Sequence, residues 1–136
     1  MLQQRAALEG VSLLPFAPQP GEIAATEHWC SSGFANTDLD LQLKRRGIQR
    51  LVVKGIIAHT CLEATVRFDA ELGYDVTVVR DATAKYSDRE MHTALEVNIP
   101  RYASAIVTTN EIIGSISSAW EAISSVGNRG GPRSAS

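Results

Sequence analysis

The centre of the chain, from residue 50 to residue 73, reads RLVVKGIIAHTCLEATVRFDAELG. Its first part, Arg50–Lys54, contains a short apolar run that is typical of a buried strand. We predict a helix from Thr60 to Leu72, because a Thr60-x-x-Glu63 capping box opens it, Gly73 can end it and its length suits a helix. A strict apolar alternation favours a strand instead, and it comprises Leu62, Ala64, Val66, Phe68, Ala70 and Leu72.

The flanking sequence repeats this alternation of strands and helices. Further strands are expected at residues 22–27, 74–79 and 105–108. Further helices are expected at residues 38–44, capped by Asn36 or Thr37 and stopped by Gly47, from the Ser87-x-x-Glu90 capping box to Pro100, and at residues 110–124. This order predicts a parallel α/β sheet. We divide the chain into an irregular segment 1–21, a domain 22–124 and a disordered tail 125–136.

Composition limits the classes of function. The chain has 136 residues, 44% of them hydrophobic, which suits one globular domain. A net charge of -2 argues against nucleic-acid binding, and no apolar stretch is long enough to span a membrane. Residues 1–20 do not resemble a signal peptide, so we expect a cytoplasmic protein whose two cysteines are free thiols. No metal or other cofactor is expected, because His28, His59 and His92 lack close ligand spacing and no phosphate-binding motif is present.

Cys61 is the main candidate for chemistry. It falls on the first turn of the predicted helix, directly after a strand and a tight bend. Backbone N–H groups and the helix dipole at such a position stabilise a thiolate, and the same N–H groups can hold an oxyanion. The alternative interpretation is a small buried thiol without a chemical role.

Two blocks of this sequence resemble the isochorismatase-like cysteine hydrolases. One is GIIAHTCLEATVRFDAELGYDVTVVRDATA, residues 55–84, and the other is SSGFANTDLD, residues 31–40, with Gly33 in place of the usual Ala. The resemblance implies a Rossmann-like, three-layer α/β/α sheet and a Cys–Asp–Lys catalytic trio in which Cys61 is the nucleophile. It also implies a cis peptide between Ile56 and Ile57, with the amides of Ile57 and Cys61 forming an oxyanion hole. The reactions of the family are hydrolyses of amides, ureido groups or vinyl ethers, and a cysteine at this position favours the amide type.

The sequence departs from this family pattern at two points. His28 stands where the family has its Lys, six residues before Phe34, and its pKa near 6.5 leaves it mostly neutral at pH 7. No segment before Glu22 matches the strand that ends in the catalytic Asp of the family. We therefore expect the first two strands of the family sheet to be missing and the general base to be absent, with open sheet edges as a consequence.

The remaining candidates have ordinary structural alternatives. Trp29, Phe34 and His59 could line a substrate pocket. Core packing is the favoured interpretation for Trp29 and Phe34, and a solvent-exposed or backbone-bonded position would explain His59 at least as well. Cys30 is expected to be an ordinary thiol, and Asp81 to accept hydrogen bonds from turn amides.

The favoured function is hydrolysis of a small amide or ureido substrate through a covalent cysteine intermediate. The alternatives are an inactive remnant or oligomerisation module of the same fold, and a redox-responsive thiol protein. The resemblance implies a homo-oligomer, because family members are commonly dimers or tetramers, and a second apolar stripe on the helix that contains Cys61 is compatible with this expectation.

Overall fold

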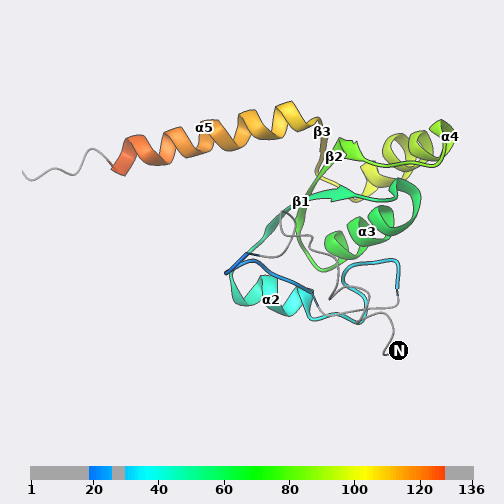
Figure 1. Ribbon diagram of the computed structural model, residues 1–136, viewed down its shortest axis with the longest axis horizontal. Helices are drawn as coiled ribbons and strands as arrows, with labels where there is room; N and C mark the ends of the chain where they lie inside the picture. The colour runs from blue at the N-terminus through cyan, green and yellow to red at the C-terminus, as the bar shows by residue number, and fades with distance from the viewer. Residues whose placement is uncertain (1–18, 26–29, 128–136) are drawn as a thin grey trace, which may run out of the picture.

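The computed structural model describes residues 19–25 and 30–127. Within them, three parallel strands form one sheet in the order β1-β2-β3, and helices connect the strands (Figure 1). The strands are β1 (Arg50–Gly55), β2 (Asp75–Thr83) and β3 (Ala105–Val107). The predicted parallel α/β fold is confirmed, and all three of these strands occur where the sequence placed them.

Helical segments separate the strands. They are α2 (Leu39–Arg45), the π-helical turn η2 (Ala58–Leu62), α3 (Glu63–Glu71), α4 (Asp88–His92), the π-helical segment η3 (Thr93–Asn98), the 3-10 turn η4 (Ile99–Arg101) and α5 (Thr109–Gly127). The helix predicted at residues 60–72 is therefore present as η2 and α3, and its strand-like alternation does not produce a strand. Pro100 lies in η4, where the helix tightens before it ends.

The core lies between one face of the sheet and the helices that cover it. Val76 and Val78 of β2 are fully buried, and their register partners on β1, Leu51 and Val53, pack on the same cluster. Residues from α2, α3, η3 and η4 complete the core, namely Leu43, Val66, Leu95 and Ile99. On the opposite face of the sheet, Val52 is 52% exposed.

The other face of the sheet has little helical cover. The resemblance implies a third layer of helices on this face. Among the described residues only α5 could belong to such a layer: it contacts β2 and then extends past the sheet (Figure 1). The helix carries large exposed apolar side chains at Ile113, Ile116, Trp120 and Ile123. No helix in the described ranges is long and apolar enough to cross a membrane.

Three local expectations need correction. Thr60 does not cap a helix, because η2 already begins at Ala58 and Ile57 holds the cap position. Residues 22–25 form no strand, while residues 26 and 27 lie outside the described part of the chain. The last helix continues through Gly127, into the segment that was expected to be a disordered tail.

Two predicted helix ends are confirmed, at Ser87 and at Gly47, whereas the cap position of α2 is Asp38 and not Asn36 or Thr37 as predicted. Ser87 caps α4, since its hydroxyl accepts from the Glu90 N–H at 3.3 Å and donates to the Glu90 carboxylate at 2.8 Å. Gly47 ends the α2 region with a φ of 66°, a conformation that favours glycine. Thr37 contributes at the start of α2 by accepting from the Leu39 N–H at 3.3 Å, although Asp38 holds the cap position.

Candidate active site

Cys61 lies on η2, immediately beyond the carboxyl end of β1. The peptide bond between Ile56 and Ile57 is cis. The Ile57 carbonyl accepts hydrogen bonds from the N–H groups of Thr60 and Leu62, both at 3.2 Å, while the Ile57 N–H has no acceptor among the described residues. Cys61 is exposed, so the interpretation as a small buried thiol is wrong.

Two backbone hydrogen bonds fix this turn to the end of β2. The Ala58 N–H donates to the Ala84 carbonyl, and the Ala84 N–H donates to the Gly55 carbonyl, each at 3.0 Å. Gly55 has a φ of +137°, which side chains strongly disfavour, and the strand register shifts between Val53 and Gly55. Glycine at position 55 therefore lets the chain leave β1 in the direction that carries Cys61 to the edge of the sheet.

Thr65 joins the Cys61 turn to the segment 31–40. Its hydroxyl donates to the Cys61 carbonyl at 2.7 Å and accepts from the Gly33 N–H at 3.0 Å. The two sequence blocks that resemble the cysteine hydrolases are thus in direct contact through one side chain. Gly33 itself has room for a Cβ, since the nearest atoms would be those of Thr65 at 3.8 and 3.9 Å.

His59 faces helix α4 from the turn that carries Cys61. Its Nε2 atom lies 3.5 Å from a carboxylate oxygen of Glu90, and its ring meets the Tyr86 ring edge-on at 5.8 Å between centroids. The Nδ1 atom is buried and has no hydrogen-bond partner. These contacts connect the turn to α4, so the interpretation of His59 as a purely solvent-exposed residue does not hold.

Phe34 is a core residue. Its ring is 7% exposed and packs against Tyr74 at 5.8 Å between centroids, which favours the packing interpretation over contact with a substrate. His28 and Trp29, the other two candidates from this region, lie outside the described residues. Cys30 is exposed, and its sulfur accepts from the Asn36 side-chain amide at 3.3 Å.

Asp81 has a structural role, as the sequence predicts, but its main partner is Thr109 at the start of α5 and not the turn that follows Asp81. One of its carboxylate oxygens accepts from both the N–H and the hydroxyl of Thr109, each at 2.8 Å, at the start of α5. The hydrogen bond from the Thr109 hydroxyl is the main cause that holds the pKa of Asp81 below its usual value.

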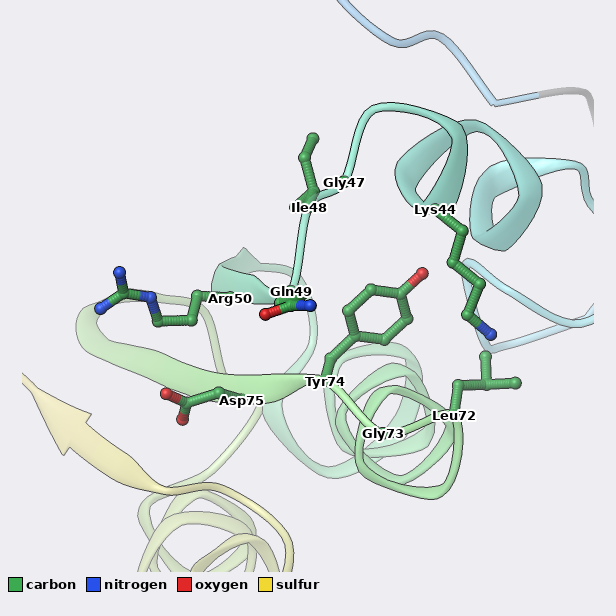
Figure 2. Close-up of a pocket in the computed structure, with 9 residues that line it drawn as sticks. All are labelled: Lys44, Gly47, Ile48, Gln49, Arg50, Leu72, Gly73, Tyr74 and Asp75. Atoms are coloured by element: carbon green, nitrogen blue, oxygen red, sulfur yellow. The ribbon is translucent and has the colours of Figure 1, made fainter.

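A large open cavity lies at the other end of the sheet. It has a volume of about 770 Å³ and is lined by the first residues of β1 and β2 and by the segments before them (Figure 2). In its wall the Tyr74 hydroxyl donates to Asp40 at 2.7 Å, and burial together with this bond raises the pKa of Tyr74 to about 12. The cavity contains none of the predicted site residues. No group of metal-binding side chains occurs among residues 19–25 and 30–127.

Asp69 is the buried ionisable residue that sequence reasoning missed. It lies on α3 and is fully buried, and neither of its carboxylate oxygens has a hydrogen-bond partner. Desolvation raises its pKa to about 7. Its position on the same helical stripe as Leu62 and Val66 is the signal that could have identified it.

Comparison with known proteins establishes the family. The family model of the isochorismatase domain matches residues 12–111 of this chain. This range includes the Cys61 turn and the segment 31–40. This chain belongs to the isochorismatase family. The resemblance seen in the sequence is thereby confirmed, and the isochorismatase domain accounts for the parallel sheet and for the order of its helices.

Among the curated relatives, the isochorismatase family protein YwoC of Bacillus subtilis is 37% identical over 91 residues, covering 66% of this chain and 47% of YwoC. The ureidoacrylate amidohydrolase RutB of Agrobacterium fabrum is 34% identical over 102 residues, covering 75% of this chain and 44% of RutB. This isochorismatase-family chain thus spans about half the length of the curated relatives it matches.

Solved structures show the same fold. A cysteine hydrolase from Pseudomonas syringae pv. phaseolicola superimposes with a TM-score of 0.67 and 30% identity, covering 76% of this chain and 53% of that one. A pyrazinamidase/nicotinamidase from Streptococcus mutans superimposes with a TM-score of 0.56 and 29% identity, covering 59% and 44% respectively. Together with the family model, these structures place the chain in the isochorismatase fold.

Proposed function

We propose that this chain is a cysteine hydrolase that acts on a small amide or ureido substrate, with Cys61 as the nucleophile. The observation that carries the proposal is the exposed thiol of Cys61 on the turn that follows β1 and the cis Ile56–Ile57 peptide. Ligands of open parallel sheets bind beyond the carboxyl ends of the strands, where this turn lies. The name of the Agrobacterium relative, a ureidoacrylate amidohydrolase, supports the substrate class.

In the proposed reaction the Cys61 thiolate attacks the carbonyl carbon of the substrate. The resulting oxyanion is held by the N–H groups of Ile57 and Cys61, and the unpaired Ile57 N–H supports this role. The C–N bond then breaks, the nitrogen leaves with a proton, and a thioester-type intermediate remains on Cys61. Water attacks this intermediate, releases the acid product and returns the thiol.

Proton transfer in this reaction requires a further group. We propose His28 for part of that role, in place of the family Lys, although it lies outside the described residues. A histidine with an ordinary pKa gives activity that depends on pH between about 6 and 7. A permanently charged ammonium would not produce such a dependence.

The experiment is a hydrolysis assay of the purified full chain with nicotinamide, ureidoacrylate and carbamoylated amines. Product release should disappear in Cys61→Ala and remain in Cys30→Ala, the matched control at the other exposed thiol. Mass spectrometry of the quenched reaction should find the acyl group on Cys61. Hydrolysis that persists in Cys61→Ala would rule out the mechanism.

A second candidate function is a non-catalytic module of the same fold that serves in oligomerisation. The exposed apolar side chains of α5 favour it. We keep a homo-oligomer in the cytoplasm as the expected state under either function. Sedimentation of the wild type and of Trp120→Glu would reveal self-association through α5, because Trp120 is 70% exposed. Glu121→Gln is the matched control on the same helix.

A further inference from the structure

His59 lies on the same turn as Cys61 and joins this turn to the segment that follows β2. Its ring meets the Tyr86 ring edge-on at 5.8 Å between centroids, and its Nε2 atom lies 3.5 Å from a carboxylate oxygen of Glu90 on α4. The His59 side chain is 22% exposed, whereas Cys61 is exposed. The turn therefore has one side chain that packs against neighbouring elements and another that is open to solvent.

The carboxylate of Glu90 is itself held in place by the capping box of α4. One of its oxygens accepts from the Ser87 hydroxyl at 2.8 Å, and the Glu90 N–H donates to the same hydroxyl at 3.3 Å. The other carboxylate oxygen is the one that faces His59. Because the capping box already orders the carboxylate, less side-chain entropy is lost when Glu90 contacts the imidazole.

The loop that carries Tyr86 is anchored at both of its ends. At its start, the Ala84 N–H donates to the Gly55 carbonyl, and the Ala84 carbonyl accepts from the Ala58 N–H, each at 3.0 Å. At its end, Ser87 holds the cap position of α4. The two partners of the imidazole, one on this loop and one on α4, are therefore fixed relative to the end of β1.

The surroundings of the imidazole indicate its tautomer. An ionised carboxylate only accepts hydrogen bonds, so the Nε2 atom that faces Glu90 carries a hydrogen. In the neutral ring the Nδ1 atom is then a bare acceptor, and it is buried without a hydrogen-bond partner in the part of the chain that the structure describes. A buried nitrogen is out of reach of a substrate on the exposed side of the turn. The ring is therefore suited to hold the turn in place and not to transfer protons.

We propose that His59 is a positioning residue for Cys61. Its contacts with Glu90 and Tyr86 hold η2 in the orientation that presents the thiol. A π-helical turn is rare, and this one contains the N–H group that is expected to bind the oxyanion together with that of Ile57. The kinetic part of the proposal rests on the proposed function of Cys61, whereas the positioning of the thiol does not.

The first arm of the test is hydrolysis by the full chain, with kcat and KM measured separately. In His59→Ala, kcat should fall roughly tenfold with KM nearly unchanged, because a displaced nucleophile affects the transition state more than binding. His59→Gln should recover most of this loss, since its side-chain N–H can take the place of the Nε2 hydrogen. Glu96→Gln is the matched control for Glu90, because its carboxylate is 44% exposed and pairs with Arg80 instead.

The second arm is alkylation by iodoacetamide, which needs no hydrolysis. Because Cys61 is already exposed, a looser turn cannot improve access, but it weakens the stabilisation of the thiolate by the turn amides. Cys61 should therefore react roughly threefold more slowly in His59→Ala, while Cys30 in the same chain reacts at its wild-type rate. Should His59→Ala fail to fold, Glu90→Ala takes its place, since the Glu90 side chain is 41% exposed.

Two results would overturn the proposal. An equal loss of kcat in His59→Gln and His59→Ala would assign proton transfer to the ring, and an unchanged alkylation rate of Cys61 in His59→Ala would remove the positioning role. If the wild type hydrolyses none of the substrates, the proposed function fails, and the alkylation rates alone decide on the positioning role.

Discussion

The buried carboxyl of Asp69 should make the stability of the chain fall as pH rises. Its pKa in the folded chain is raised from 3.8 to about 7, with burial as the cause. Between these two values the unfolded chain has lost this proton while the folded chain still holds it, so stability decreases with pH across that window. Above about pH 7 the penalty stays constant.

The size of the effect follows from the pKa difference. One unit of pKa corresponds to about 1.36 kcal/mol, so a difference of about three gives an upper limit of about 4 kcal/mol. Relaxation of the surrounding side chains and entry of water when the carboxyl group ionises reduce this penalty. We therefore expect about 2 to 4 kcal/mol between pH 4 and pH 8.

The assay compares urea unfolding of wild type and Asp69→Leu at several pH values. Carboxylates that accept hydrogen bonds in the folded state have lowered pKa values, as Asp40 does because of Lys44. Their protonation at low pH destabilises the folded chain, which is a trend opposite to that of Asp69. The difference between variant and wild type cancels that background. It should favour the variant increasingly from pH 4 to pH 7 and then level off, whereas Glu71→Gln should show no such trend. A difference that is flat with pH, or that favours the wild type at high pH, would refute the reasoning.

Three further predictions concern the frame of the candidate site. Gly55→Ala should destabilise the chain by about 1 to 3 kcal/mol through its backbone alone, since a Cβ there would meet no atom within 4 Å; an unchanged unfolding midpoint would contradict this. Ser87→Ala should cost about 1 kcal/mol by removing the cap of α4, measured by urea unfolding with Ser118→Ala as the matched control; equal losses in both would argue against the capping effect. Thr65→Val should leave the Gly33 N–H and the Cys61 carbonyl without a common partner and speed hydrogen exchange at Gly33, whereas unaltered exchange would show that the link does not hold the segment 31–40.

The sheet could be predicted from the sequence because its signals are local. The β-branched runs of β1 and β2, together with Gly47 and Gly73 between elements, identify the strands and helix ends without tertiary information. The helix after β1 was predicted correctly against its own alternating pattern. Its length and its closing glycine outweighed the periodicity, which reflects burial of Leu62 and Val66 rather than a pleated strand.

The details that failed depend on contacts between distant segments. Thr60 resembles a cap in sequence, but the Ala58 N–H is already bound by the Ala84 carbonyl, so the helical turn starts earlier and Thr60 falls inside it. A strand is also expected at residues 22–27, yet residues 22–25 are irregular. A strand is stable only when it pairs with a neighbour, and none of the three described strands pairs with residues 22–25.

Asp69 and Cys61 are connected by the geometry of a single helical face. The Thr65 hydroxyl bonds the Cys61 carbonyl at 2.7 Å, and Thr65 and Asp69 both line a groove of about 250 Å³ beside β1. The groove and the turn that carries Cys61 therefore share one helical face as a wall, so a change at Asp69 acts close to the candidate nucleophile.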